Sequence, residues 1–130
     1  MSTLGTTKPA MTLEQRRSQT AWRFAQEGVA LSGQYKDLAK AAPALIMNNG
    51  LMQTLAFYED KKSKAHHETL ARHLRCWIMM AQSGGAAQDP KFQPFMEILL
   101  KADSAQYRQA TEEALLFLRW LRQFAAALGG

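Results

Sequence analysis

Apolar residues recur every three or four positions along most of this chain, and no segment alternates with a period of two. The first pattern places apolar side chains on one face of an α-helix, whereas strict alternation is typical of a strand. The pattern therefore predicts an all-α fold, a single-domain bundle of about six helices over residues 12–130. Residues 1–11 are polar, with a glycine and a proline, and predict a flexible N-terminal tail.

The first predicted helix begins at Thr12, because Thr12 and Gln15 have the spacing of a capping box. It runs to about Leu31 and ends at Ser32-Gly33. The side that we expect to be buried consists of Leu13, Ala21, Phe24, Ala25 and Gly28.

The segment from Tyr35 to Lys62 predicts two helices joined by a turn at Asn48-Asn49-Gly50. Pro43 lies inside the first of them, where it removes a backbone donor and crowds the preceding turn. Neither of the two alanines before it can cap a new helix, so we expect one kinked helix. Gly50 can adopt the left-handed conformation that closes a helix without a Cβ clash.

Two further helices are expected at about 65–82 and from near Pro94 to about 102. Between them, the Gly-rich stretch 83–90 is expected to be the most flexible part of the chain. Asp103 or Ser104 caps the last helix, which is apolar on nearly every side. Such a helix is expected to be central or to meet another subunit.

The residues from Lys40 to Phe57 resemble a known family. The runs APALI (42–46), NNGL (48–51) and QTLAF (53–57) are similar to the signature of the small all-helical subunit, the fifth Cmr protein, of type III-B CRISPR effector complexes. The resemblance extends more loosely to 16–24 and Trp77, and has no diagnostic residues after residue 82.

The resemblance implies a non-catalytic subunit of an RNA-guided, RNA-targeting antiviral complex. In that family, copies stack head-to-tail along the inner filament and line the channel that holds the duplex of guide RNA and target RNA. The implied partners are other subunits of the complex, copies of the same chain, and the guide RNA and target RNA backbone. RNA cleavage and second-messenger synthesis belong to other subunits.

The net charge of +5 is compatible with an anionic partner. Lys and Arg bind phosphates without reading sequence, which guide pairing would do instead. The basic residues in or beside the matched segment are the nucleic-acid-binding candidates, although an ordinary solvated surface is an equal alternative for any single patch: Arg16, Arg17, Arg23, Lys40, Lys61 and Lys62. No aromatic run is interleaved with them, so we do not expect base stacking.

Catalytic motifs are not found in the sequence. It has no nucleophile elbow, phosphate-binding glycine loop or dinucleotide fingerprint, so we expect no enzyme, catalytic residue, cofactor or small-molecule substrate. The best metal candidates, His66, His67 and His73, lack a pair of carboxylates, and we expect solvated or partly packed histidines without a metal. Glu112 and Glu113 point about 100° apart on a helix and are expected to be solvated.

Three rival functions remain. A helical adaptor would bind only protein, and its basic surface would be incidental. A metal-dependent hydrolase would use the histidines. A helix-turn-helix reader would use Gln53 and Thr54, but that helix has no Lys or Arg before Lys61 to contact phosphates.

The compartment that we expect is the cytoplasm. Cys76 is the only cysteine, so no disulfide can form within the chain, and we expect a small buried thiol. Residues 1–8 lack the apolar run of a signal peptide, and no apolar segment has the length that a bilayer requires, so we expect no contact with a membrane.

Overall fold

The computed structural model describes residues 11–85 and 88–129, which contain six α-helices and no strand. The helices are α1 (Leu13–Leu31), α2 (Tyr35–Asn49), α3 (Leu51–Asp60), α4 (Ala65–Ser83), α5 (Phe92–Lys101) and α6 (Ser104–Leu128). This confirms the predicted all-α bundle. Residues 1–10 of the expected tail, and 86 and 87 of the expected flexible loop, lie outside the described residues.

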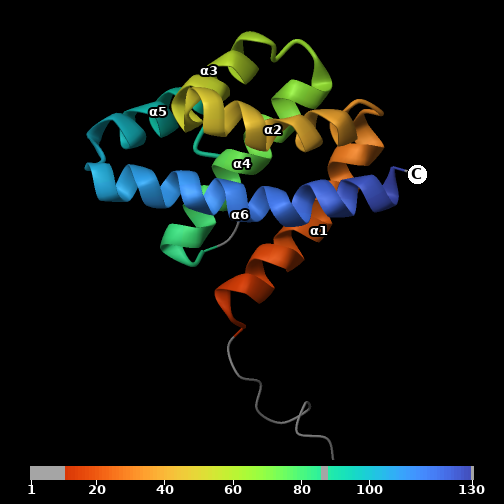
Figure 1. Cartoon of the computed structure of the whole chain (residues 1–130), viewed down its shortest axis with the longest axis horizontal. Coiled ribbons are helices and arrows are strands. Elements are labelled where there is room, and N and C mark those ends of the chain that lie inside the picture. The colour runs from red at the N-terminus through yellow and green to blue at the C-terminus, as the bar shows by residue number, and fades with distance from the viewer. Residues whose placement is uncertain (1–10, 86–87, 130) are drawn as a thin grey trace, which may run out of the picture.

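Helix α6 is the central element, as its apolar pattern predicted. It packs against α1, α2 and α4, and it crosses the whole width of the molecule in Figure 1. Helix α2 runs alongside it, α1 crosses its C-terminal half, and α4 passes behind it. The core of the bundle, to which α3 and α5 also contribute, contains the largest fully buried side chains: Trp77, Tyr35, Tyr58, Phe95 and Phe117.

Capping boxes begin α1 and α6, two helices that pack on each other. The Thr12 hydroxyl accepts a hydrogen bond from the Gln15 amide at 3.0 Å, and the Gln15 side chain accepts one from the Thr12 amide at 2.8 Å. Asp103 and Gln106 form the same pair at 2.8 and 3.0 Å. These bonds satisfy amides that have no partner within the helix. The start of α1 is therefore confirmed, and Asp103 caps α6.

The α2–α3 connection consists of a single residue, Gly50. Helix α2 continues through Pro43, which confirms one helix in place of two. Gly50 has φ +90° and ψ 160°, so its φ is positive as expected, although its ψ differs from that of the left-handed helix. Because Gly50 has no side chain to cap α3, the Tyr107 hydroxyl of α6 accepts a hydrogen bond from the Met52 amide at 3.1 Å. This bond joins the α2–α3 hairpin to α6.

One residue at a helix end is more exposed than the apolar pattern predicted. Leu13, expected on the buried side of α1, is exposed. It lies in the first turn of the helix, where fewer neighbouring helices cover the side chain. The interior positions Ala21, Ala25 and Gly28 are buried as expected.

A chain of hydrogen bonds joins α1, α2 and α4, and it runs from the buried Tyr35 and His73 to Glu27 at the surface. The Tyr35 hydroxyl lies 2.7 Å from His73 Nδ1, and His73 Nε2 lies 2.6 Å from Glu27 Oε1. Burial raises the pKa of Tyr35, so its O–H donates to Nδ1 and the neutral His73 donates through Nε2 to Glu27. Burial lowers the pKa of His73 to about 4, although Glu27 opposes this shift. Arg72 completes the chain by donating to Glu27 at 3.1 Å.

Gly28 makes room for the Tyr35 ring. A Cβ added at Gly28 would overlap that ring, whereas one added at Gly33 would meet no atom within 4 Å. The ring has little freedom to move away, since its hydroxyl is bonded to His73.

We expect Gly28→Ala to lower the free energy of unfolding by about 1–3 kcal/mol, because overpacking a buried contact forces side chains or backbone to shift. Urea denaturation monitored by circular dichroism measures this change. Gly33→Ala is the matched control and should change stability by less than about 0.5 kcal/mol. Equal effects of the two substitutions would contradict the packing at Gly28.

The free energy of unfolding should fall by about 2 kcal/mol between pH 7 and pH 5 through His73 alone. The folded pKa of about 4 lies below the ordinary histidine value of 6.5, so the unfolded chain binds more protons in this interval and acid favours unfolding. Urea unfolding across this pH range tests it. His73→Gln should lose most of the slope and keep only the part due to His66 and His67, whose pKa values are also lowered by burial. An unchanged slope in this variant would contradict the assignment.

Candidate nucleic-acid interface

The six basic residues predicted to contact nucleic acid do not form one patch. Arg16, Arg17 and Arg23 lie on α1, Lys40 lies on α2, and Lys61 and Lys62 follow α3. Their environments differ in burial and in hydrogen-bonded partners.

Arg17 is a structural residue. Its side chain is only 9% exposed. Its Nε lies 2.6 Å from Glu113 Oε2, and its Nη2 lies 2.9 Å from Glu113 Oε1. Trp77 Nε1 donates to the same carboxylate at 2.8 Å. The hydrogen bond to Glu113 raises the pKa of Arg17. We therefore leave Arg17 out of the interface, and the expectation that Glu113 is solvated is wrong.

The other two arginines of α1 differ from each other. Arg16 donates to the Met80 carbonyl at 3.0 Å, and its guanidinium lies 5.9 Å from the centroid of the Trp77 ring. Arg23 is exposed and forms no ion pair with any residue that the structure describes. Of the α1 arginines, only Arg23 presents its whole charged group to solvent.

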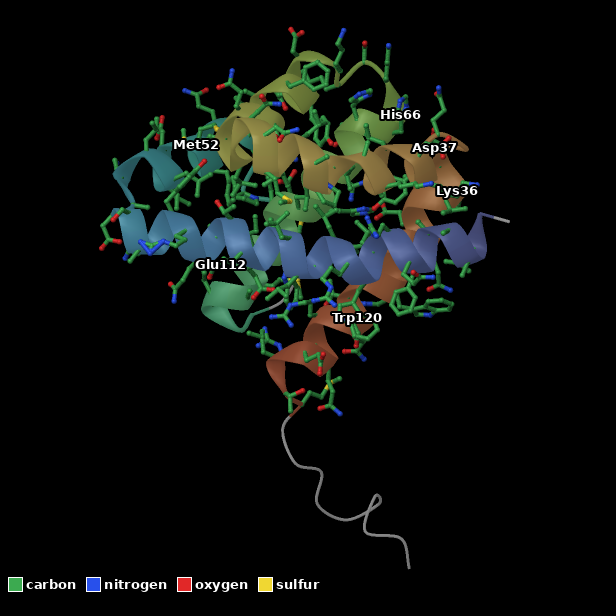
Figure 2. The ribbon with its side chains drawn as sticks, viewed as in Figure 1. Lys36, Asp37, Met52, His66, Glu112 and Trp120 are labelled. Carbon is green, nitrogen blue, oxygen red and sulfur yellow. The ribbon has the colours of Figure 1, made fainter. Side chains whose placement is uncertain are left out.

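Lys40 belongs to a basic hollow between α2 and α6. The hollow measures about 280 Å³ and is lined by Lys36, Asp37, Lys40, Arg122, Gln123 and Ala126. Within residues 11–85 and 88–129, none of its three cations has a carboxylate within 4 Å. Figure 2 shows Lys36 and Asp37 at the start of α2, beside the C-terminal half of α6. We refer to Lys36, Lys40 and Arg122 as the basic hollow.

Lysines of the α3–α4 loop form a second basic group. Lys62 pairs with Glu59 at 3.0 Å, and the Lys61 ammonium lies 5.8 Å from the centroid of the Phe57 ring. Lys64 is exposed and precedes α4. The loop lies on the same side of the molecule as the start of α2 in Figure 1. Exposed ion pairs such as Lys62–Glu59 are weak, so this loop still presents positive charge.

Two members of the basic hollow, Lys36 and Arg122, were not among the residues predicted to bind nucleic acid. Lys36 lies one helical turn before Lys40, and this spacing was a usable signal. Arg122 is more than 80 positions away in the sequence, and only the packing of α2 on α6 brings it to the same hollow. No local pattern distinguishes Arg122 from the other arginines of α6.

The three histidines are buried, so the expectation that they are solvated is wrong, while partial packing was the better of the two alternatives. Both ring nitrogens of His73 are hydrogen-bonded, which leaves no lone pair for a metal. His66 and His67 lie side by side at the start of α4, with ring centroids 4.4 Å apart. Over the described ranges, no three His, Cys, Asp or Glu side chains are placed to hold a metal ion.

Cys76 is the buried thiol that the sequence predicted. Burial raises its pKa to about 11, so the thiol remains protonated and unreactive near neutral pH. Arg75 beside it is bound by Asp89 through two hydrogen bonds of 2.9 and 3.0 Å. The positive charge of Arg75 is therefore neutralised within the fold by Asp89.

An apolar groove lies between α2, α3 and α5. It measures about 750 Å³, and Leu45, Met52, Phe57 and Met96 provide most of its apolar lining. Figure 2 places Met52 toward the opposite end of α2 from Lys36. The basic hollow and the apolar groove are therefore separate surfaces.

None of the helices formed by residues 11–85 and 88–129 combines the length and apolar character needed to cross a membrane. The most apolar one, α5, has only ten residues.

Comparison with known proteins gives a consistent result. The family model described as CRISPR-associated protein (Cas_Cmr5) matches residues 13–128. The CRISPR system Cmr subunit Cmr5 of Thermus thermophilus is 33% identical over 96 residues, which are 74% of this chain and 75% of the relative. The crystal structure of a CRISPR-associated Cmr5 family protein from Thermus thermophilus matches with a TM-score of 0.72 and 30% identity, covering 92% of this chain and 98% of that one. The resemblance inferred from residues 40–57 is thus confirmed, and the chain belongs to the Cmr5 family of CRISPR-associated proteins.

Proposed function

We propose that this chain is a non-catalytic small subunit of a type III-B CRISPR effector complex in the cytoplasm, where it contacts the backbone of guide RNA and target RNA. Membership of the Cmr5 family supports the assignment to a Cmr complex. Copies of the chain stack head-to-tail along the inner filament and meet other subunits. Cleavage is performed elsewhere in the complex.

The observation that best supports RNA contact is the basic hollow. Three cations from two helices lie around one depression, and none of them is neutralised by an ion pair within the described part of the chain. A phosphate placed there gains electrostatic attraction without breaking an ion pair of these three cations, although the Asp37 carboxylate also lines the hollow. Arg122 offers a planar fork of donors, whereas Lys36 and Lys40 provide point charges. Such contacts position a backbone and leave sequence recognition to guide pairing.

The residues predicted from the sequence that remain in this proposal lie on different parts of the surface. Lys40 contacts phosphate as a member of the basic hollow, and Lys61 and Lys62 do so from the α3–α4 loop on the same side of the molecule. Arg23 adds an exposed charge on α1. Arg16 contributes least, because the Met80 carbonyl and the Trp77 ring already hold its guanidinium.

The double variant Lys36→Ala/Lys40→Ala should weaken RNA retention by the reconstituted complex. It should also reduce the dependence of log affinity on log salt by about 0.7–0.9 for each lost phosphate contact. Binding measured over a series of salt concentrations gives both quantities. Lys91→Ala/Lys101→Ala, which removes the same charge near α5, is the matched control and should leave the slope unchanged. A similar loss in both double variants would refute a specific role for the basic hollow.

A second candidate function, a helical adaptor that binds only protein, is favoured by the apolar groove. Methionine side chains adapt to different partners, and Met52 and Met96 both line this groove. The adaptor differs from the proposed function in one respect only, since it makes no nucleic-acid contact. The salt dependence described above therefore distinguishes the two.

Phe57→Glu should reduce incorporation into the complex by at least about tenfold, if a partner subunit covers the groove, because the interface would then bury an unpaired charge. Native mass spectrometry of the reconstituted complex measures incorporation. Leu31→Glu adds the same charge at an exposed apolar position at the end of α1 and should be tolerated. Normal incorporation of the Phe57 variant would show that the groove is not used in assembly.

A further inference from the structure

The basic hollow adjoins a second depression on the other side of α6. This second hollow measures about 350 Å³, and its lining includes Glu14, Leu116, Arg119 and Trp120. Arg122 and Gln123 line both hollows, so the two depressions meet at these side chains. Figure 2 shows the two ends of this surface, with Lys36 above the α6 ribbon and Trp120 below it. We refer to the surface as the α6 track; it consists of Lys36, Lys40, Arg119, Trp120, Arg122 and Gln123.

Both hollows of the α6 track contain positive charge. Arg119, like the three cations of the basic hollow, forms no ion pair with any described residue. Two carboxylates line the hollows, Asp37 at one end and Glu14 at the other. The track therefore has four cations and two carboxylates. This excess of positive charge over an extended surface favours binding of a polyanion over binding of an isolated anion.

The end of the α6 track at Arg119 and Trp120 differs from the end at Lys36 and Lys40, because it contains aromatic surface. The Trp120 ring is partly exposed, and it packs against Phe124 with a centroid distance of 5.7 Å. Trp22 of α1 is 41% exposed and meets the edge of the same Phe124 ring at 5.2 Å. Phe124 thus supports two indoles from different helices, and this packing restricts the orientation of both rings.

A single-strand-binding surface has two elements: cations that follow the backbone and an aromatic ring that stacks on a base. The α6 track combines cations with the partly exposed, oriented indole of Trp120. In a duplex the bases are already stacked on one another and are not available to the ring. We propose that the α6 track binds unpaired, single-stranded RNA. Phosphates lie in the basic hollow and beside Arg119, and a neighbouring base stacks on Trp120. The inference rests on the proposed function for its ligand class, and it differs from the expectation that base stacking plays no part.

The test uses the full-length chain and a labelled oligouridylate of about twelve nucleotides, within the range of site sizes of single-strand-binding folds. An RNA duplex of the same length serves as the competing ligand, and fluorescence anisotropy reports binding of each. Trp120→Ala should weaken single-strand binding about 5- to 150-fold, the range for one lost base stack, and leave duplex binding unchanged. Trp120→Phe keeps an aromatic face and should restore most of the affinity, which separates stacking from a loss of folding.

Two further variants make the test specific. Leu100→Ala removes an exposed apolar side chain from α5 and should not affect single-strand binding. Arg119→Ala/Arg122→Ala should reduce the salt slope for the single strand by about 0.7 per lost contact. Equal affinity of the wild-type chain for both RNAs would overturn the inference, as would full single-strand affinity in Trp120→Ala.

The outcomes also separate this inference from the proposed function. If Trp120→Ala retains single-strand affinity but no longer enters the complex, the indole is a protein contact, and the single-strand assignment is overturned. If the wild-type chain enters the complex and Lys36→Ala/Lys40→Ala weakens RNA retention, the proposed function stands whatever Trp120 does. If the chain binds oligouridylate through Trp120 but never enters the complex, the inference stands and the proposed function fails.

Discussion

The hydrogen-bond chain from Tyr35 through His73 to Glu27 is the constraint on which the arrangement of the helices depends. It takes one residue from each of α2, α4 and α1. Tyr35 and His73 are fully buried, and a buried polar group left without a partner costs about 1–3 kcal/mol. Gly28 provides the space in which the Tyr35 ring lies. Since Tyr35 is the first residue of α2, the same bond fixes where Lys36 and Lys40 emerge beside α6.

The fold divides the positive charges of the chain into two groups. Arg17, Arg72 and Arg75 are bound by carboxylates from other parts of the chain and act as internal connections. The cations on α2 and α6 have no such partners among the described residues and remain available to an external anion. The charge that can bind a ligand is therefore a property of the packing, and a count of lysines and arginines along the sequence does not reveal it. This division explains why Arg17 and Lys40, equally basic in the sequence, have different roles.

Local features of the fold were predictable because local interactions cause them. The Thr12 and Asp103 caps, the glycine between α2 and α3 and the uninterrupted α2 all follow from a few neighbouring residues. The errors involve pairs far apart in the sequence: Glu113 is bound by Arg17 and Trp77, and His73 by Tyr35 and Glu27. The candidate site follows the same rule. The pairing of Lys36 with Lys40 was visible as one helical turn, whereas the approach of Arg122 to these two lysines requires the packing of α2 on α6.

The bond from the Met52 amide to the Tyr107 hydroxyl also has a consequence for synthesis on the ribosome. Residues 35–60 can form their two helices early, but the acceptor that caps α3 is made more than 50 residues later. Until α6 emerges, the apolar surfaces of α1 and α2 that pack on it have no cover, and an intermediate that exposes such surface is prone to aggregate. A nascent chain of this protein therefore completes its core only when its last helix has left the exit tunnel.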